Sequence, residues 1–399
     1  MNKSFAAGAL LAALIILSSL PQPAHARHVL DAGTNLSFWW TIYEENENGI
    51  RQMGSQDPAA DVTSGFSIRQ ARVVLYYEDT DHNLGAMAQV RLEENVSILD
   101  FYGVWKPRHY FNLYVGQMKI PSTYEVLASD AELDFITRSS LSMDIADWAL
   151  SRTPYQGYGA FKGIHCYNRD VGIGIKGSIG PRSDRRLVRY FLMVSNGLGA
   201  GIFIGGKEKK GFIYSNDFGD YFYGARLDVS PKKWLTLGGH YSYNRHDNML
   251  FNDEKSVYDL NRYSWSADLR VKFPLVRITG MYGGGKVDED FFDTGLDNME
   301  YSGWEVKGFV TVWKEHLELG VRYDAYINEN NENGDETQQN NWTFGINFMP
   351  ISAIRIQTNY IIKKTESDYE PDFDDNIFFV NFQYRMAVRG ILGGRSGSK

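Results

Sequence analysis

The amino-acid sequence predicts an all-β protein, a 16-stranded antiparallel transmembrane β-barrel with short periplasmic turns and long outer loops. Three observations lead to this fold class. Apolar and polar residues alternate with a period of two along most of the chain. The connections between the alternating segments are long and short in turn. Aromatic residues make up 14% of the 399 residues, beside 39 glycines and only 11 prolines, a composition that favours strands.

Sixteen segments carry the alternation. Residues 317–326 are the clearest, because Leu319 and Val321 lie on one face while Glu318 and Arg322 lie on the other. Each segment has about 9 to 12 residues, the length that a tilted strand needs to cross the apolar layer of an outer membrane. The predicted strands are residues 35–43, 66–77, 84–93, 97–106, 110–119, 170–178, 187–195, 220–230, 234–244, 262–272, 275–284, 303–312, 317–326, 341–349, 353–363 and 376–386.

The connections give an independent test of the fold. Short turns on one side and long loops on the other are the topology of an outer-membrane barrel, and an even number of strands places both chain ends in the periplasm. Only the connection 94–96 departs from the pattern, because it is short where a long loop is expected. The other long connections are 44–65, 120–169, 196–219, 245–261, 285–302, 327–340 and 364–375.

A soluble all-β fold, such as a sandwich or a propeller, is the alternative for the same alternation. Two features favour the barrel. The polar faces carry Arg, Glu and Asp in the middle of strands, and the apolar faces carry aromatic residues near strand ends, as membrane interfaces require. These aromatic residues are Trp40, Tyr77, Trp105, Tyr243, Trp304, Trp342 and Tyr384.

Composition argues against several functional classes. The single cysteine, Cys166, cannot form a disulfide framework, a Cys-rich zinc site or an iron–sulfur cluster. The eight histidines show no metal-ligand spacing, and a net charge of −8 disfavours nonspecific nucleic-acid binding. We therefore expect no cofactor, no metal and no nucleic-acid partner.

The first 26 residues have the three parts of a cleaved signal peptide. Lys3 supplies a basic start, residues 5–20 are apolar, and Ala24 and Ala26 form a small-x-small cleavage site. An uncleaved anchor helix is the alternative, and the short apolar stretch disfavours it. We expect the barrel to span residues 27–386 and a C-terminal tail to span 387–399.

Several stretches resemble the phosphate-selective porin O and P family. The sequences are FSIRQAR at 66–72, VGQMKIP at 115–121, SNG at 195–197, DYFYGARL at 220–227, GVRYD at 320–324 and the closing strand at 378–384. The resemblance implies a sixteen-stranded and often trimeric outer-membrane channel. The chain shows no dense cluster of lysine or arginine that would mark a dedicated phosphate site, so the resemblance supports the channel better than a particular solute.

The polar strand faces are predicted to line the lumen, and basic residues outnumber acidic ones there. A wall rich in arginine favours anions and holds phosphate or carboxylate groups transiently. The alternative is that pairs such as Arg226 with Asp228, or Arg322 with Asp324, neutralise each other and hold the barrel shape. The predicted pore-lining residues are Arg72, Arg91, Asp100, Arg226, Asp228, Arg270, Arg277, Glu305, Arg322, Asp324, Arg355 and Arg385.

The loop at 120–169 is the longest, and the resemblance implies that it folds inward and narrows the pore. Its basic residues would face six carboxylates and set up a local field. A loop packed on the outer surface is the alternative. The basic residues are Lys119, Arg138, Arg152 and Lys162, and the carboxylates are Glu125, Asp130, Glu132, Asp134, Asp144 and Asp147.

The other outer loops are acidic, as residues 329–336 and 366–375 illustrate. Carboxylates at the outer face can share divalent cations with lipopolysaccharide, or they can simply keep the surface soluble. Outer-membrane lipid and lipopolysaccharide are therefore expected partners, beside small ions and solutes that include phosphate and other anions.

The predicted function is an outer-membrane porin that lets small hydrophilic solutes and ions diffuse passively, with a mild anion preference, in a Gram-negative bacterium. The alternative is a structural or partner-binding barrel, for example a sheath for a secretion or electron-transfer component. A hydrolytic enzyme is disfavoured, because His240 beside Ser242 lacks a visible third partner. The resemblance implies a homotrimer.

Overall fold

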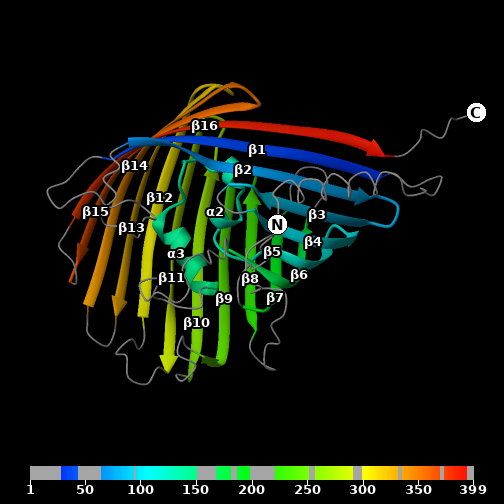
Figure 1. Cartoon of the computed structure of the whole chain (residues 1–399), viewed down its shortest axis with the longest axis horizontal. Helices are drawn as coiled ribbons and strands as arrows, with labels where there is room; N and C mark the ends of the chain where they lie inside the picture. The colour runs from blue at the N-terminus through cyan, green and yellow to red at the C-terminus, as the bar shows by residue number, and fades with distance from the viewer. Residues whose placement is uncertain are drawn as a thin grey trace, which may run out of the picture.

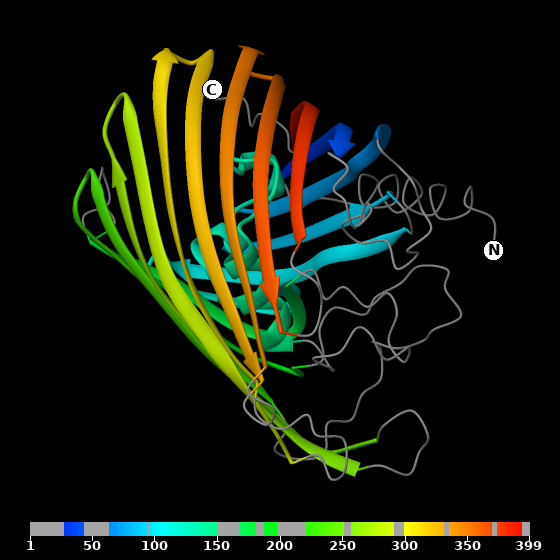
Figure 2. The ribbon, with the colours of Figure 1, turned by 90° about the vertical axis from the view of Figure 1, so that its left-hand side faces the viewer.

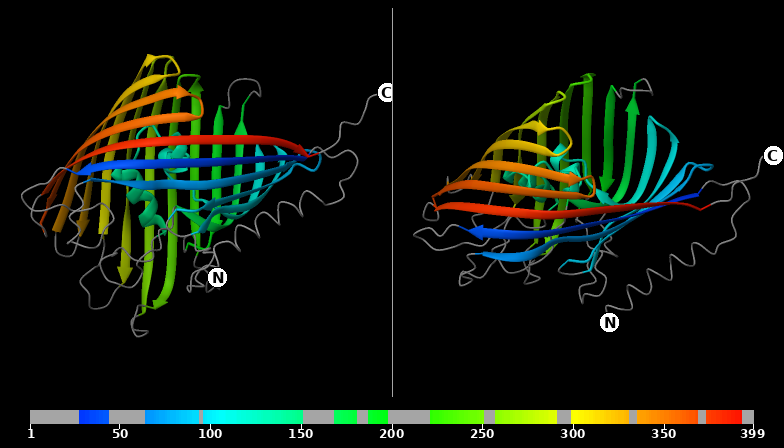
Figure 3. Two further views of the ribbon diagram at one scale, coloured as in Figure 1. Left: turned by 45° about the horizontal axis from the view of Figure 1, so that its top comes forward. Right: turned by 90° about the horizontal axis from the view of Figure 1, so that it is seen from above.

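Sixteen antiparallel strands form a closed barrel in the computed structural model of the chain (Figure 1). The structure describes residues 28–43, 64–93, 96–150, 168–180, 187–197, 221–250, 257–290, 299–330, 335–368 and 373–392. Each strand pairs with its neighbours in the sequence, and β1 pairs with β16. Figure 3 shows the resulting ring of strands from two further directions.

The strand bounds follow from the alternating segments. The strands are β1 (His28–Tyr43), β2 (Ser64–Asp79), β3 (Leu84–Arg91), β4 (Ser97–Arg108), β5 (Phe111–Lys119), β6 (Arg169–Ile179), β7 (Val188–Ser195), β8 (Phe222–Lys232), β9 (Leu235–Leu250), β10 (Val257–Lys272), β11 (Val276–Asp290), β12 (Met299–Trp313), β13 (Leu317–Asn330), β14 (Asp335–Ile351), β15 (Ile354–Ser367) and β16 (Phe373–Leu392).

Closure gives every strand a partner on both sides. Ser37 of β1 faces Gln70 of β2 on one side and Gln383 of β16 on the other. An unpaired strand edge in lipid would leave peptide groups without hydrogen bonds, so a sheet can cross a membrane only as a closed barrel. None of the helices among the described residues has the length and apolarity of a membrane span.

The sixteen predicted strands and the antiparallel order are confirmed, and several strands are longer than predicted. β1 begins at His28 instead of residue 35, and β16 ends at Leu392 instead of residue 386, with these two ends paired. The predicted limits followed side-chain alternation, whereas the ladder needs only backbone groups. Residues 1–26, assigned to the signal peptide, and 393–399 of the predicted tail lie outside the described part of the chain.

Side chains alternate between a polar interior and an apolar exterior. On β12, Glu305 and Lys307 are buried inside, while Trp304 and Val306 are exposed on the outer surface. Toward the long loops, outward rings of neighbouring strands contact one another and form what we call the aromatic row. Its contacts, with ring-centroid distances, are Tyr243–Tyr263 at 5.0 Å, Trp265–Tyr282 at 5.3 Å and Trp304–Tyr323 at 4.9 Å. Such a row is typical of a membrane interface.

The connection between β5 and β6 folds into the barrel (Figures 1 and 2). Its described part, residues 120–150, is named the infolded loop here. It contains α2 (Tyr124–Leu127), the 3-10 turn η1 (Asp130–Glu132) and α3 (Ser140–Leu150). Hydroxyl caps start both helices, because Thr123 accepts from Val126 N and Ser139 accepts from Ser142 N, each at 3.2 Å.

Apolar side chains hold the infolded loop against two parts of the wall. Leu141 and Ile145 of α3 are fully buried in a cluster with Met281, Tyr301 and Tyr326. On the opposite side, the buried side chain of Ile136 packs with residues of β15 and β16, which are Ile361, Ile377 and Phe379. Each such aliphatic side chain contributes about 1.5 to 3 kcal/mol when it leaves water.

Glycines make room for this packing. A Cβ atom on Gly345 of β14 would lie 2.8 Å from the ring of Phe135, and one on Gly283 of β11 would lie 2.9 Å from Ile145. These distances are shorter than van der Waals contact. At these two positions the wall therefore has no side chain, and Phe135 and Ile145 approach its backbone closely.

We predict that Gly345→Ala displaces Phe135 and weakens the docking of the infolded loop by about 1 to 3 kcal/mol, the usual cost of overpacking. Hydrogen exchange of residues 130–138 in the folded protein should become faster. Gly308→Ala is the matched control, because the nearest atom to its added Cβ lies at 3.9 Å. Equal exchange in the two variants would contradict the packing role of Gly345.

Candidate functional site

The inner wall carries all twelve residues that the sequence predicts to face the lumen. Arg91 is the least obvious of them, and it is buried and paired in register with Arg72 on the same face. The full set is Arg72, Arg91, Asp100, Arg226, Asp228, Arg270, Arg277, Glu305, Arg322, Asp324, Arg355 and Arg385. Their part in conduction stays a prediction, and their surroundings divide them into a buried and a water-accessible group.

Ion pairs occupy the buried group at the level of the infolded loop. Arg226 lies 2.7 Å from Asp268 and 2.8 Å from Asp228, and Arg322 lies 2.9 Å from Asp324. The side chains of Arg226 and Arg322 are each 3% exposed. The alternative of pairing within the wall therefore applies to both arginines, and neither presents a free charge to a passing ion.

Besides the exposed pair of Glu132 with Arg385, three ion pairs with buried or partly buried partners join the infolded loop to the wall, and we call these three the anchor pairs. In each pair the carboxylate belongs to the loop and the cation to a strand. The pairs, with N–O distances, are Glu125–Lys307 at 2.7 Å, Asp130–Arg72 at 2.5 Å and Asp134–Arg277 at 3.0 Å. The loop carboxylates thus neutralise wall cations that the sequence left available for anions.

Amide side chains hold the stretch between η1 and α3, which has no regular hydrogen bonding of its own. Asn347 donates to the carbonyl of Asp134 at 2.9 Å, and Asn359 accepts from the N–H of Ile136 at 2.7 Å. Gln357 donates to the carbonyl of Leu133 at 3.3 Å. Sequence reasoning did not assign these amides to the loop. The sequence signal for this contact is that Asn and Gln, and not charged residues, occupy alternate inward positions of β14 and β15, since amides can both donate to and accept from backbone groups.

The predicted constriction residues contact the loop itself. Lys119 donates to the carbonyls of Val126 at 2.8 Å and Ala128 at 2.6 Å. Arg138 donates to the carbonyl of Glu125 at 3.1 Å and also forms an ion pair with Asp130. Both cations therefore order the turn after α2. Arg152 and Lys162 lie outside the described residues.

Glu125 is ionised because its surroundings compensate its burial. Burial alone would raise the pKa of Glu125, but the charges of Lys307 and Arg322 lower it to about 2. The other carboxylate oxygen accepts from the N–H of Ser139 at 2.9 Å and from its hydroxyl at 3.1 Å. For Asp130, burial is likewise outweighed by Arg138 and Arg72, which hold its pKa well below the usual value.

The water-accessible group of charges lies at the short-turn end of the barrel. A cavity of about 440 Å³ opens there, and Arg355 and Arg385 line it. The other charged residues of its lining are Lys272, Arg277, Glu132, Asp134, Glu315 and Glu318. Arg385 is 48% exposed, and Arg189 of β7 is 47% exposed. These guanidinium groups can meet ions in solution, unlike those of Arg226 and Arg322.

Among the described residues, His240 contacts serine hydroxyl groups of the wall. Its Nδ1 lies 2.6 Å from the hydroxyl of Ser266, and the neighbouring hydroxyl of Ser242 pairs with that of Ser264. These contacts link β9 to β10 within the wall. The described part of the chain also contains no group of three side chains placed to hold a metal ion.

We predict that Glu125→Gln releases the infolded loop, because it leaves Lys307 buried with only Glu305, at 3.4 Å. Removing one partner of a buried pair costs about 3 to 5 kcal/mol when it leaves the other charge uncompensated, and the remaining Glu305 makes the cost smaller here. Hydrogen exchange across α2 and α3 should rise. Glu132→Gln is the control, because its pair with Arg385 at 3.5 Å is exposed and contributes about 1 kcal/mol at most. Similar exchange in both variants would refute the anchoring role of Glu125.

We predict that the loop stays docked in acid down to pH values near the folded pKa of Glu125. A carboxylate with a lowered pKa stabilises the folded state above its unfolded pKa, about 4.3, and loses this contribution as the pH falls through its folded pKa, about 2. Protection factors of α2 and α3, corrected for intrinsic exchange, should therefore be alike at pH 7 and pH 5. Loss of protection already at pH 5 would contradict the ion pairing.

Comparisons with known proteins agree with this architecture. The family model described as phosphate-selective porin O and P matches residues 310–386. A loop-deletion mutant of OmpT, an outer-membrane protein of Vibrio cholerae, is similar in structure with a TM-score of 0.60 and 11% identity, covering 90% of this chain and 99% of that one. A search of curated proteins found no match.

Two further solved structures have the same fold. An anion-selective porin from Comamonas acidovorans superimposes with a TM-score of 0.59 at 10% identity, covering 91% of this chain and all of that chain. The outer-membrane channel DcaP of Acinetobacter baumannii gives 0.59 at 12% identity, with coverages of 90% and 97%. The resemblance to the phosphate-selective porin O and P family is therefore confirmed on residues 310–386, and the chain has the fold of outer-membrane porins.

Proposed function

We propose that the protein is a passive diffusion channel for small hydrophilic solutes and ions, with a mild preference for anions. The family match, the polar interior and the apolar exterior support this proposal. The Comamonas protein of the same fold is described as anion-selective. The family and the fold also fit a channel better than an enzyme. The infolded loop would narrow the lumen, and solutes would pass beside it without a chemical step.

The anion preference rests on the solvent exposure of the two side chains in each ion pair at the short-turn end of the barrel. Arg189 is 47% exposed while its partner Asp228 is 15% exposed, and Arg277 is 29% exposed while Glu318 is 12% exposed. In both pairs the guanidinium faces the water and the carboxylate lies beneath it. Arg385 and its partner Glu132 show the opposite order, at 48% and 61% exposed, and four cations and four carboxylates line the cavity. The excess of exposed positive charge that an ion would meet in this part of the lumen is therefore small. The preference is mild because carboxylates also line the cavity.

The wall at the level of the infolded loop would not select ions in this scheme. Arg226 and Arg322 have buried partners, and Arg322 also donates to the carbonyl of Thr137 at 2.8 Å. Their role would be to fix the loop and the shape of the path. The loop already occupies wall surface that a protein held inside the barrel would need, which disfavours the sheath alternative.

A homotrimer is part of the proposal. The similar OmpT of Vibrio cholerae is described in a trimer form. A porin barrel that trimerises buries part of its apolar outer face against neighbouring copies. Cross-linking of the purified protein tests this directly, and a product of monomers alone would refute it.

We predict that the double variant Arg355→Glu, Arg385→Glu shifts the reversal potential toward cations, because both residues line the accessible cavity. The measurement is the zero-current potential across a planar bilayer under a KCl gradient. Arg108→Glu with Lys314→Glu is the matched control. It makes the same charge change on exposed turns outside the cavity lining. An unchanged potential in the first variant would contradict the assignment of selectivity to this cavity.

A further inference from the structure

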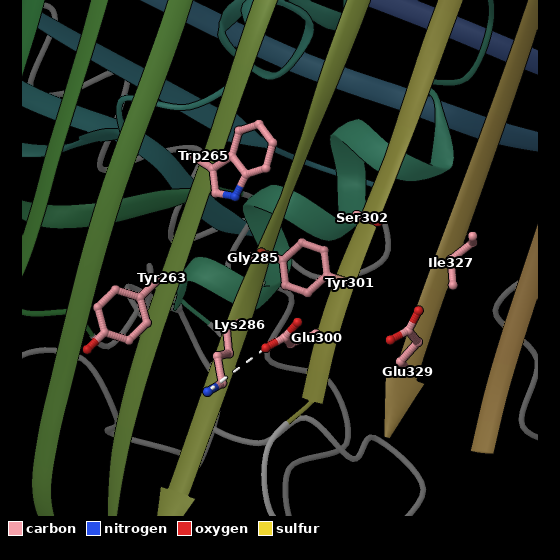
Figure 4. Close-up of a pocket in the computed structure, with 9 residues that line it drawn as sticks. All are labelled: Tyr263, Trp265, Gly285, Lys286, Glu300, Tyr301, Ser302, Ile327 and Glu329. Carbon is pink, nitrogen blue, oxygen red and sulfur yellow. Dashed lines mark ion pairs between the residues drawn. The ribbon is translucent and has the colours of Figure 1, made fainter. Parts of the chain in front are cut away.

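A hollow of about 320 Å³ opens on the barrel wall across β10 to β13, near the long-loop end (Figure 4). Its lining includes Gly285 of β11 with Tyr301 and Ser302 of β12, and Ser302 pairs in register with Gly284. Trp265 of β10 stands in register on one side of this pair and Ile327 of β13 on the other. The hollow thus follows from two small residues placed between two large ones on the outward face.

A charged row borders the hollow on the side of the long loops. In register across the four strands it contains Tyr263, Lys286, Glu300 and Glu329. Lys286 and Glu300 form a loose ion pair at 4.0 Å, drawn as a dashed line in Figure 4, and their side chains are 39% and 52% exposed. All four residues belong to the lining. They are therefore available to a ligand.

The opposite border of the hollow is apolar. The next outward pair toward the short turns is Tyr282 with Trp304, which belong to the aromatic row. Aromatic rows of this kind mark the boundary between hydrocarbon and headgroups. The hollow therefore lies at headgroup level, with an aromatic side toward the acyl chains and a charged side toward the outer water.

The lining combines three kinds of recognition chemistry. The face of Trp265, which is exposed, can pack against the apolar face of a sugar ring. The carboxylates of Glu300 and Glu329 can accept hydrogen bonds from hydroxyl or amide N–H groups, and Lys286, which they partly neutralise, can pair with a phosphate. The volume falls at the lower end of small-molecule sites, about 300 to 1,000 Å³.

We propose that this hollow binds the phosphorylated amino-sugar headgroup of a glycolipid in the outer leaflet. The sugar ring packs on Trp265, the phosphate pairs with Lys286, and the amide N–H of the acylated amino group and the free hydroxyl groups donate to Glu300 and Glu329. A simple phospholipid headgroup offers the phosphate but no ring for Trp265. The hollow opens outward, so this binding is independent of the diffusion path in the lumen.

The test compares lipid binding to the refolded full-length protein in detergent by native mass spectrometry. The probes are diphosphorylated lipid A, its dephosphorylated form and phosphatidylglycerol. Ser302→Trp fills the floor of the hollow and should weaken lipid A binding at least tenfold. Val306→Trp is the control, because Val306 is exposed on the outward face of the same strand and does not line the hollow. Lys286→Gln should bind the two forms of lipid A alike.

Three outcomes would overturn the proposal. The first is lipid A binding by Ser302→Trp that equals wild type. The second is wild-type protein that binds phosphatidylglycerol as tightly as lipid A, which would mean a general phosphate contact. The third is that the Ser302→Trp variant no longer forms the oligomer but still binds lipid A. This result would mean that the hollow is a contact between copies of the chain. If Ser302→Trp does not fold, Lys286→Gln decides through its ratio of affinities for the two forms of lipid A. Unchanged conductance of Ser302→Trp separates this result from the proposed channel function.

Discussion

The buried ion pair between Glu125 and Lys307 is the interaction on which the arrangement of the lumen depends. Neither charge could remain inside the barrel alone, because an unpaired buried charge is strongly unfavourable. The pair therefore fixes α2 against β12, and Tyr124 adds a hydrogen bond to Glu305 at 2.8 Å. From this point the chain reaches the opposite wall, where Asp130 binds Arg72. Two polar contacts on opposite sides thus hold the infolded loop across the barrel.

Docking of the loop gives chemically identical side chains two different roles. Where the loop covers the wall, arginine is neutralised and shapes the path, as Arg226 and Arg322 do. Toward the short turns, arginine reaches water, as Arg385 does although it pairs with Glu132 of the loop at 3.5 Å. The same sequence feature, an inward arginine on a strand, is therefore buried and paired at one depth and accessible to water at another. The charge of the lumen cannot be obtained by summing the residues on its wall.

The sequence predicts the barrel well because its pattern is local. A period of two fixes which side chains face inward, and alternating connection lengths fix the topology. The pair Arg322–Asp324 was foreseeable, because the two residues lie two apart on one strand. The partners of Glu125, Asp130 and Asp134 were not, since each lies on a strand distant in sequence and no local spacing encodes the contact. For the same reason, the amides of β14 and β15 could be placed on the inner face but not matched to the backbone they bind.

The central claim is that the infolded loop limits the width of the lumen. The most direct test is to remove the loop and measure the unitary conductance of the protein in planar bilayers. Residues 124–150 would be replaced by a short flexible Gly/Ser linker, and heat-modifiable migration would verify that the barrel has folded. If the loop narrows the lumen, the conductance should be several-fold larger than that of the wild-type protein. Equal conductance of the two proteins would mean that another segment limits the passage and would contradict the role assigned to the loop.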